Sequence, residues 1–229
     1  MKLDIVIPSK GRKEKLDNCL NSIFLSAKQE INIYLYFSIE EEFDDYQKQF
    51  DGISNIHVIL LDSYRVPDFW NGHIENSTSD AMCYLNDDVI LFEDTIEMIV
   101  KEFEENFPDY DGIVGLNQLN LNDFKTVDGA FGVIGIKYAE RFPAKQVWCP
   151  DYNRFFADFE LWQFAQSIGK FVFSHRAQIN HMHPITNRQL ADATHADVRQ
   201  WLAVDRKINQ LRKNRDLLWG RDFKLLSKE

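Results

Sequence analysis

The sequence predicts an α/β protein with a mostly parallel sheet flanked by helices, followed by a helical extension at the C-terminus. Short apolar, β-branched runs alternate with segments whose apolar residues recur at helical spacing. Strands and helices that alternate in this way form parallel sheets with right-handed crossovers. A last segment, 191–218, is helical throughout. With 229 residues, the chain can bury one substantial core and carry this extension.

The first half begins with a strand at residues 3–8, which is apolar and ends in the turn-forming sequence Pro-Ser-Lys-Gly-Arg. A helix is expected next, because Leu16, Leu20, Ile23 and Phe24 lie on one helical face. The further elements expected here are strands at 31–39 and 55–62, a fourth strand that ends at Asn86-Asp87-Asp88, and helices at 13–27 and 96–107. A short helix should begin in 40–45, and 65–80 should contain a loop and one amphipathic helix with Trp70 and Ile74.

The second half is less periodic. We expect a helical turn at 138–142, a helix at 155–167, and strands at 111–116, 129–136, 170–174 and 177–183. The extension has an apolar stripe that should pack on the sheet domain or on a partner, formed by Val198, Trp201, Leu202, Val204, Ile208, Leu211 and Leu217.

The stretch 81–94, AMCYLNDDVILFED, places Asp87 and Asp88 at the C-terminal end of a buried strand. Ligands bind at that end in open α/β sheets, and paired carboxylates suit a divalent cation that bridges to phosphates. Taken alone, the same residues could be an Asn/Asp-rich turn that ends a strand.

Four separated pieces resemble the GT-A nucleotide-sugar glycosyltransferases, in particular the inverting enzymes of family 2. They are DIVIPSKGR, YLNDDVILFED, ADFEL at 157–161 and NHMHP at 180–184. The resemblance implies a GT-A (Rossmann-like) domain at 1–190. Its nucleotide-binding half would be 1–110 and its acceptor half 111–190, with 191–229 as the extension.

The resemblance also implies a donor site. Pro8 and Ser9 would line the nucleoside pocket, and Arg12 would approach the base or the phosphates. Glu40 is the nearest match to a carboxylate that binds uracil, and Asp87 would hold the ribose or assist the metal.

The segment Asn86-Asp87-Asp88 resembles the DxD motif of these enzymes, with Asn86 in place of the first acid. Asp88 would then bind Mn or Mg, and the cation would neutralise the diphosphate leaving group. His181 is the expected second ligand. His181 and His183 should face opposite sides of an extended segment, so that only one of them meets the metal.

Asp158 matches the catalytic acid of the family, although Ala157 replaces the usual Glu before it. In an inverting transfer one carboxylate takes the proton of the acceptor hydroxyl, and Glu160 is the second candidate for this base. An alternative for Asp158 is an acid that only stabilises a helix N-terminus. Trp148, Tyr152 and Trp162 could stack on an acceptor sugar or equally belong to the core.

Composition and charge indicate the compartment of the protein and the partners it disfavours. Cys19, Cys83 and Cys149 stand apart without a CxxC pair, which favours reduced core thiols in a cytoplasmic protein. No signal peptide or membrane-spanning run is visible. The net charge of −10 opposes non-specific binding to nucleic acid, although residues 199–229 carry nine Lys/Arg against four Asp/Glu.

The predicted activity is metal-dependent, inverting transfer of a sugar from a UDP-sugar to a hydroxyl, most simply on a glycan. Three alternatives stay open. One is the glycosylation of hydroxymethylated bases in DNA, as by some phage enzymes of this type. The second is a non-catalytic nucleotide-sugar-binding module, and the third is a nucleotidyltransferase. The sequence does not indicate the sugar, the acceptor or the oligomeric state.

Overall fold

The computed structural model describes residues 1–63, 65–119, 130–183 and 193–221. Its elements, in chain order, are β1 (Leu3–Ser9), α1 (Lys13–Ser26), β2 (Ile31–Phe37), α2 (Glu40–Gln49), β3 (Ile56–Leu60), α3 (Val66–Asn76), β4 (Ala81–Tyr84), β5 (Val89–Leu91), α4 (Thr95–Asn106), β6 (Ile113–Gln118), β7 (Gly132–Gly135), α5 (Ile136–Ala139), a 3-10 turn (Pro143–Lys145), α6 (Ala157–Ser167), β8 (Phe171–His181) and α7 (Ala193–Asn214).

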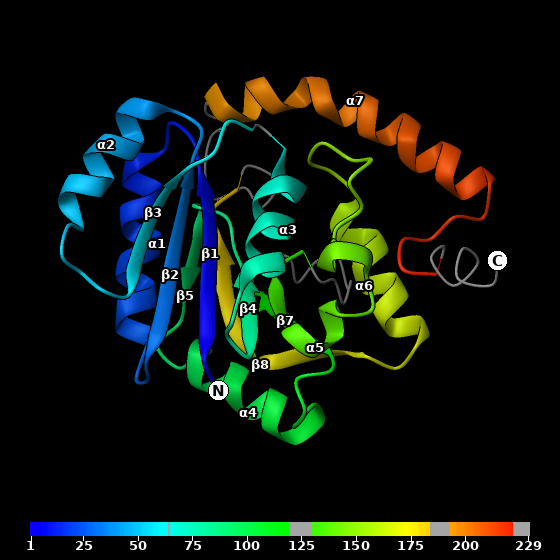
Figure 1. Ribbon diagram of the computed structural model, residues 1–229, viewed down its shortest axis with the longest axis horizontal. Coiled ribbons are helices and arrows are strands. Elements are labelled where there is room, and N and C mark those ends of the chain that lie inside the picture. The colour runs from blue at the N-terminus through cyan, green and yellow to red at the C-terminus, as the bar shows by residue number, and fades with distance from the viewer. Residues whose placement is uncertain (64, 120–129, 184–192, 222–229) are drawn as a thin grey trace.

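The strands form one sheet in the order β3-β2-β1-β4-β7-β6-β8-β5 (Figure 1). The four strands from β3 to β4 are parallel to their neighbours, as the alternation of strands and helices predicted. In the rest of the sheet β6 and β8 are parallel, whereas β7 runs antiparallel to β4 and β6, and β5 runs antiparallel to β8. The α/β class is therefore confirmed, and its second half is a mixed sheet.

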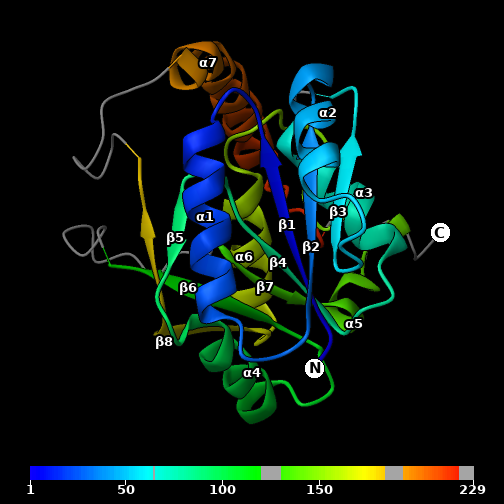
Figure 2. The same cartoon turned by 90° about the vertical axis from the view of Figure 1, so that its left-hand side faces the viewer.

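Helices cover both faces of the sheet (Figures 1 and 2). Buried side chains of α1, α2 and α4 form one core cluster, and those of α3, α5 and α6 form the other. Strand β1 contributes to both, because alternate side chains of a strand point to opposite faces. Ile5 and Ile7 belong to the first cluster and Val6 to the second.

Two elements differ from the expectation in ways that shape the site. The runs at 170–174 and 177–183 form a single strand, β8, whose pairing with β6 is irregular between Gly115 and Asn117. The apolar run after Asp88 forms strand β5, which pairs with the end of β8. The strand expected at 129–136 starts outside the described residues, and its described part is β7.

Helix α7 starts above the carboxyl end of β1 and runs over α3 and α6 (Figure 1). The predicted apolar stripe packs on the domain only in part: Ile208 packs against the core cluster of α3, α5 and α6, whereas Val204 is 43% exposed and Leu211 56% exposed. Among the described side chains of α7, the buried ones are Asp205, Asn209 and Arg212, which recur at helical spacing. They are polar because the surface beneath presents backbone N–H groups and a carboxylate, which need partners once buried. The expected boundary at 190/191 lies outside the described residues.

Cys19, Cys83 and Cys149 are buried free thiols, as predicted. In the described part of the chain, no helix combines the length and the apolar character that crossing a membrane requires.

Candidate active site

Ser9, the last residue of β1, and Asp87, three residues beyond the end of the neighbouring parallel strand β4, lie at matching positions. The register pairs Val6 of β1 with Tyr84 of β4, so each chain continues for three residues before Ser9 meets Asp87. The Ser9 hydroxyl donates a hydrogen bond of 2.8 Å to Asp87 Oδ2. Two segments far apart in sequence are thereby joined at the carboxyl edge of the sheet, where ligands of α/β proteins bind.

Arg12, just before α1, joins the two consecutive carboxylates. Its Nη1 donates to Asp87 Oδ1 at 2.9 Å and to Asp88 Oδ2 at 3.1 Å. All three side chains are buried. Two buried carboxylates beside each other are costly unless a cation compensates them. Arg12 therefore organises the acidic pair, and it also lines the two cavities described below.

The pairing of β5 with β8 brings His181 to Asp88. Val89 is in register with His181, and the N–H of Met182 donates to the carbonyl oxygen of Asp88 at 2.7 Å. As a result, His181 Nε2 lies 3.3 Å from Asp88 Oδ1. Two ligands of one cation with bonds of about 2.1–2.2 Å are separated by about 3.0–3.5 Å, so this pair fits a divalent metal.

The described residues contain no group of three or more His, Cys, Asp or Glu side chains that could hold a metal ion. Asp88 and His181 would supply two ligands to a bound cation. The remaining positions of a hard cation such as Mn or Mg are commonly filled by substrate phosphates and water.

The pKa values of the two aspartates shift in opposite directions. Burial alone would raise the pKa of Asp88, but the hydrogen bond and charge of His181, together with the charge of Arg12, outweigh it and lower the pKa to about 2. For Asp87, burial outweighs the charge of Arg12 and the Ser9 hydrogen bond, and its pKa is raised. Asp88 is therefore the more acidic of the two carboxyl groups.

His183 does not face away from His181, and that expectation was wrong. Strand β8 ends at His181, and the N–H of His183 donates to the His181 carbonyl oxygen at 2.9 Å. The chain turns there, so the alternation of an extended segment does not apply. The two imidazole rings lie 5.0 Å apart, and both line the same cavity.

That cavity, about 520 Å³ in volume, brings Asp88, His181 and Asp158 together. Asp158 lies in the first turn of α6 and is half-buried. The preceding Phe156 has a left-handed backbone, with φ of 70°, a conformation that non-glycine residues adopt mainly where structure or function demands it. We call this space the wide cavity.

A second space, the narrow cavity, adjoins it and has a volume of about 60 Å³. Pro8, Ser9, Arg12 and Asp87 all line it, so the structure gathers four of the five donor residues that the resemblance implied. At this size it admits about two water molecules, and a nucleoside enters only if the side chains around it move.

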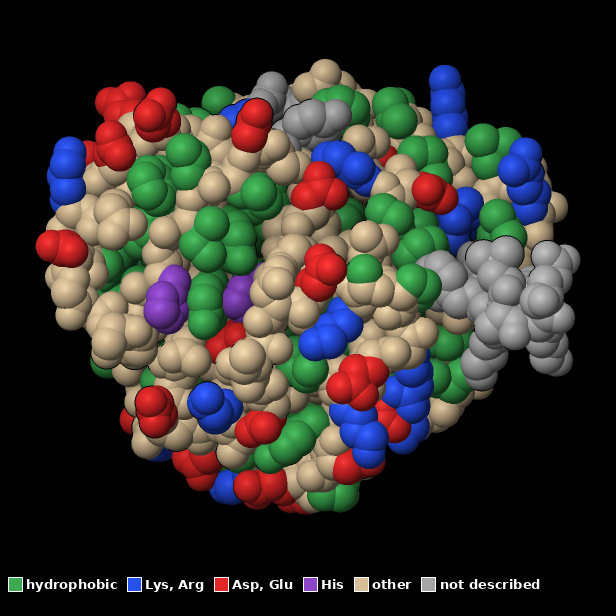
Figure 3. Space-filling view, viewed as in Figure 1, with side chains coloured by type: hydrophobic (Ala, Val, Ile, Leu, Met, Phe, Trp, Pro, Cys, Tyr) green, Lys and Arg blue, Asp and Glu red, His purple; other side chains and the backbone are tan. Residues whose placement is uncertain are grey.

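Glu40, the fifth of these residues, is not brought to the cavity. It is exposed in the first turn of α2, whose acidic side chains lie together on the surface at the upper left of Figure 3. Ser38 lines the narrow cavity instead.

Glu160 does not line the wide cavity and is held by hydrogen bonds within the protein. Its two oxygens accept hydrogen bonds from the Tyr152 hydroxyl at 2.6 Å, from Arg212 at 2.7 and 2.8 Å, and from the Trp219 N–H at 2.8 Å. With these partners, the Glu160 carboxylate links α6 to α7. Asp158, which lines the wide cavity, is therefore the better placed of the two candidate bases.

The aromatic residues of the wide cavity are not those that the sequence suggested. Trp148 and Tyr152 are fully buried in the core, and Trp162 is not among the cavity residues. The rings that line it are Trp70, Phe131, Phe155, Phe156 and Phe159. The run FFADF around Asp158 was a local signal for three of them, whereas no local signal marks Arg154 or Arg199, which also line the cavity.

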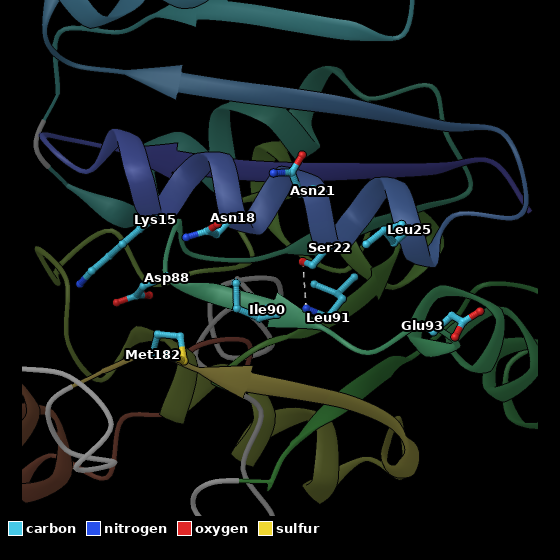
Figure 4. Close-up of a pocket in the computed structure, with 10 residues that line it drawn as sticks. All are labelled: Lys15, Asn18, Asn21, Ser22, Leu25, Asp88, Ile90, Leu91, Glu93 and Met182. Carbon is cyan, nitrogen blue, oxygen red and sulfur yellow. Dashed lines mark hydrogen bonds between the residues drawn. The ribbon is translucent and has the colours of Figure 1, made fainter.

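A groove of about 680 Å³ runs between α1 and β5 (Figure 4). Lys15, Asn18 and Leu25 line its α1 side, and Asp88 lies at one end. The Leu91 N–H donates to the Ser22 hydroxyl at 3.0 Å across it. Because Asp88 also lines the wide cavity, the groove adjoins the candidate metal site.

Comparison with known proteins gives one family match. The family described as Glycosyl transferase family 2 matches residues 4–176, more than half of the chain. No curated protein matches the sequence.

Several solved structures share the fold at low identity. A mannosyltransferase, PcManGT from Pyrobaculum calidifontis, in complex with GDP-Man and Mn²⁺, is 10% identical with a TM-score of 0.61, covering 78% of this chain and 56% of that one. TarS from S. aureus is 11% identical with a TM-score of 0.59, covering 78% and 36%. A 1–349 fragment of TarS in complex with UDP is 10% identical with a TM-score of 0.56, covering 78% and 59%. This chain therefore spans between about a third and three fifths of their lengths.

Proposed function

The chain belongs to glycosyl transferase family 2, and from this premise we propose that it transfers a sugar from a nucleotide-sugar, most simply a UDP-sugar, to an acceptor hydroxyl with inversion. The observation that carries the proposal is the convergence of Asp88, His181 and Asp158 on one cavity beside the narrow cavity of Ser9 and Asp87. Two of the similar solved structures, one with UDP and one with GDP-Man, support a nucleotide-linked donor.

In the proposed arrangement the nucleoside occupies the narrow cavity after it opens, and the sugar lies in the wide one. Asp158 accepts the proton of the acceptor hydroxyl while that oxygen forms a bond to the anomeric carbon. The bond from the anomeric carbon to the diphosphate breaks in the same displacement. Attack opposite the leaving group inverts the anomeric centre, and no covalent enzyme intermediate is needed.

Asp88 and His181 would hold Mn or Mg in this proposal. Bound there, the cation would neutralise charge on the leaving diphosphate as a Lewis acid. The Mn²⁺ in the structure of PcManGT supports a divalent metal.

The acceptor side of the proposal rests on the aromatic rings of the wide cavity. Phe155, Phe156 and Phe159 lie around Asp158 in sequence and line the same space. Phe159 is 44% exposed. Exposed aromatic faces beside a base suit the apolar face of a sugar ring, which favours a glycan acceptor.

The proposal is tested by calorimetric titration of UDP, GDP, CDP and ATP, each with and without Mn²⁺. Metal-dependent binding of one nucleoside diphosphate, followed by transfer from the corresponding nucleotide-sugar, is the expected result. Release of pyrophosphate from ATP would instead indicate a nucleotidyltransferase. Binding of a nucleotide-sugar without turnover against glycan and modified-DNA acceptors would indicate a binding module.

A further inference from the structure

We propose that helix α7 completes the diphosphate end of the donor site, through Arg199 and through its hold on the backbone of Arg154. The helix begins at Ala193, beyond the segment 4–176 that matches the family. The inference rests on the donor function proposed above and assigns part of that site to an element outside the matched domain.

The junction of the two cavities is the starting point. Arg12, Val66, Asn86 and Arg154 line both of them. If the nucleoside lies in the narrow cavity and the sugar beside Asp158, the diphosphate that links them must lie at this junction. Arginine is the side chain best suited to phosphate oxygens there, because its planar fork can donate two hydrogen bonds at once.

Arg12 cannot serve the diphosphate alone. Its Nη1 is already shared between Asp87 and Asp88, and the three charges together leave a net negative centre. Besides any cation that Asp88 and His181 would hold, further positive side chains are Arg154 at the junction, Arg199 of α7 in the wide cavity and Lys10 in the narrow one.

Helix α7 contributes to both cavities. Arg199 and Leu202 line the wide cavity, and Thr194 and Trp201 line the narrow one. The Thr194 hydroxyl donates to the carbonyl oxygen of Lys10 at 3.1 Å, which places the start of the helix against the loop between β1 and α1. The helix thus spans from the nucleoside end of the site to the loop that precedes α6.

Asp205 fixes that loop. Its Oδ1 accepts from the backbone N–H and the side-chain amide of Asn153 at 2.9 and 2.8 Å. Its Oδ2 accepts from the backbone N–H groups of Arg154 and Phe155, both at 2.8 Å. The Asp205 side chain is fully buried. Four donated hydrogen bonds to one buried carboxylate make Asp205 a positioning residue for Arg154 and for the Phe155–Asp158 stretch that follows.

The proposed chemistry adds no new step to the transfer. As the anomeric carbon leaves the diphosphate for the acceptor oxygen, the bonding electrons pass to the diphosphate oxygen and its negative charge grows. Arg154, whose backbone Asp205 holds at the junction, and Arg199, which lines the wide cavity, stabilise that charge more than they stabilise the bound donor.

The experiment compares Arg154→Ala, Arg199→Ala and the control Arg206→Ala, an exposed arginine of α7 that lines neither cavity. Dissociation constants for UDP and UMP are measured by calorimetry with Mn²⁺, or for GDP and GMP if the wild-type chain prefers guanosine. We expect each cavity variant to weaken diphosphate binding at least tenfold and monophosphate binding much less, with the control unchanged.

Asp205→Asn adds a readout for positioning. It should raise the donor KM and reduce the preference for UDP over UMP. Asp205→Glu should return both values part of the way to those of the wild type. Diphosphate binding by Arg199→Ala and Arg154→Ala that equals the control would overturn the role of α7 and leave the donor function standing. Failure of the wild-type chain to bind any nucleoside diphosphate would overturn the donor function and this proposal together.

Discussion

Asp88 Oδ1 lies 3.3 Å from His181 Nε2, although the first residue precedes β5 and the second ends β8. The antiparallel pairing of these two short segments creates the contact. Since the separation matches that of two ligands on one cation, it makes the metal requirement directly testable.

Replacing either Asp88 or His181 by Ala should remove the metal-dependent part of nucleotide binding. We expect the affinity for Mn²⁺ in the presence of UDP to fall by a factor of about 10–100, the range found even for supporting residues of metal sites. Calorimetric titration of Mn²⁺ measures this. Asp44→Ala, at an exposed acid of α2, is the matched control. Mn²⁺ affinity that is unchanged in both site variants would refute the assignment.

Replacing Asp158 by Asn should reduce kcat by a factor of about 10²–10⁴, because the acceptor hydroxyl loses its base. Nucleotide binding should be retained, since Asp158 is not among the residues of the narrow cavity. Initial rates and calorimetry on the same preparation separate the two effects. A parallel loss of binding and turnover would argue that Asp158 is a structural acid.

Arg212→Ala should destabilise the protein strongly, and Leu211→Ala hardly at all. Arg212 donates to both oxygens of buried Glu160, and removing one partner of a buried pair typically costs about 3–5 kcal/mol. Leu211 is 56% exposed, and its truncation should change the free energy of unfolding by less than about 0.5 kcal/mol. Urea denaturation of both variants tests this, and the reverse order would show that the apolar contacts of α7 matter more than its buried polar ones.

Asp4 should make stability depend on pH below neutrality. Burial alone would raise its pKa, but hydrogen bonds from His73, Ser79, Ser77 and Asn32 outweigh burial and lower the pKa to about 2. A carboxylate whose pKa is lowered on folding stabilises the protein above its unfolded pKa, and the contribution is lost as pH falls from about 4 to 2.

The size of this contribution follows from the shift. Lowering the pKa from 3.8 to about 2 corresponds to about 2 kcal/mol at pH 7. The Asp4→Asn variant should therefore be less stable than the wild type by about 2 kcal/mol at pH 7, and by markedly less at pH 3. Urea denaturation at both pH values measures the difference. A difference from the wild type that is the same at both pH values would contradict the linkage.

The sequence was sufficient where local pattern and strand direction decide the outcome. The short apolar, β-branched run at residues 3–8 predicted β1, and the apolar run before Asn86 predicted β4. The resemblance placed Ser9 and Asp87 in one donor site, and the hydrogen bond between them joins these two segments at the carboxyl edge of the sheet.

The sequence by itself determined the α/β class, the family resemblance and the acids that lie at the carboxyl edge of the sheet. Only the tertiary structure decided that β5 pairs with β8 and so sets His181 beside Asp88, that Glu40 points away, and that α7 buries Asp205 and Arg212 while exposing Leu211. The reason is physical. Periodicity records which side of an element is apolar, whereas the partner of a buried polar side chain depends on which distant backbone or charge the fold brings against it.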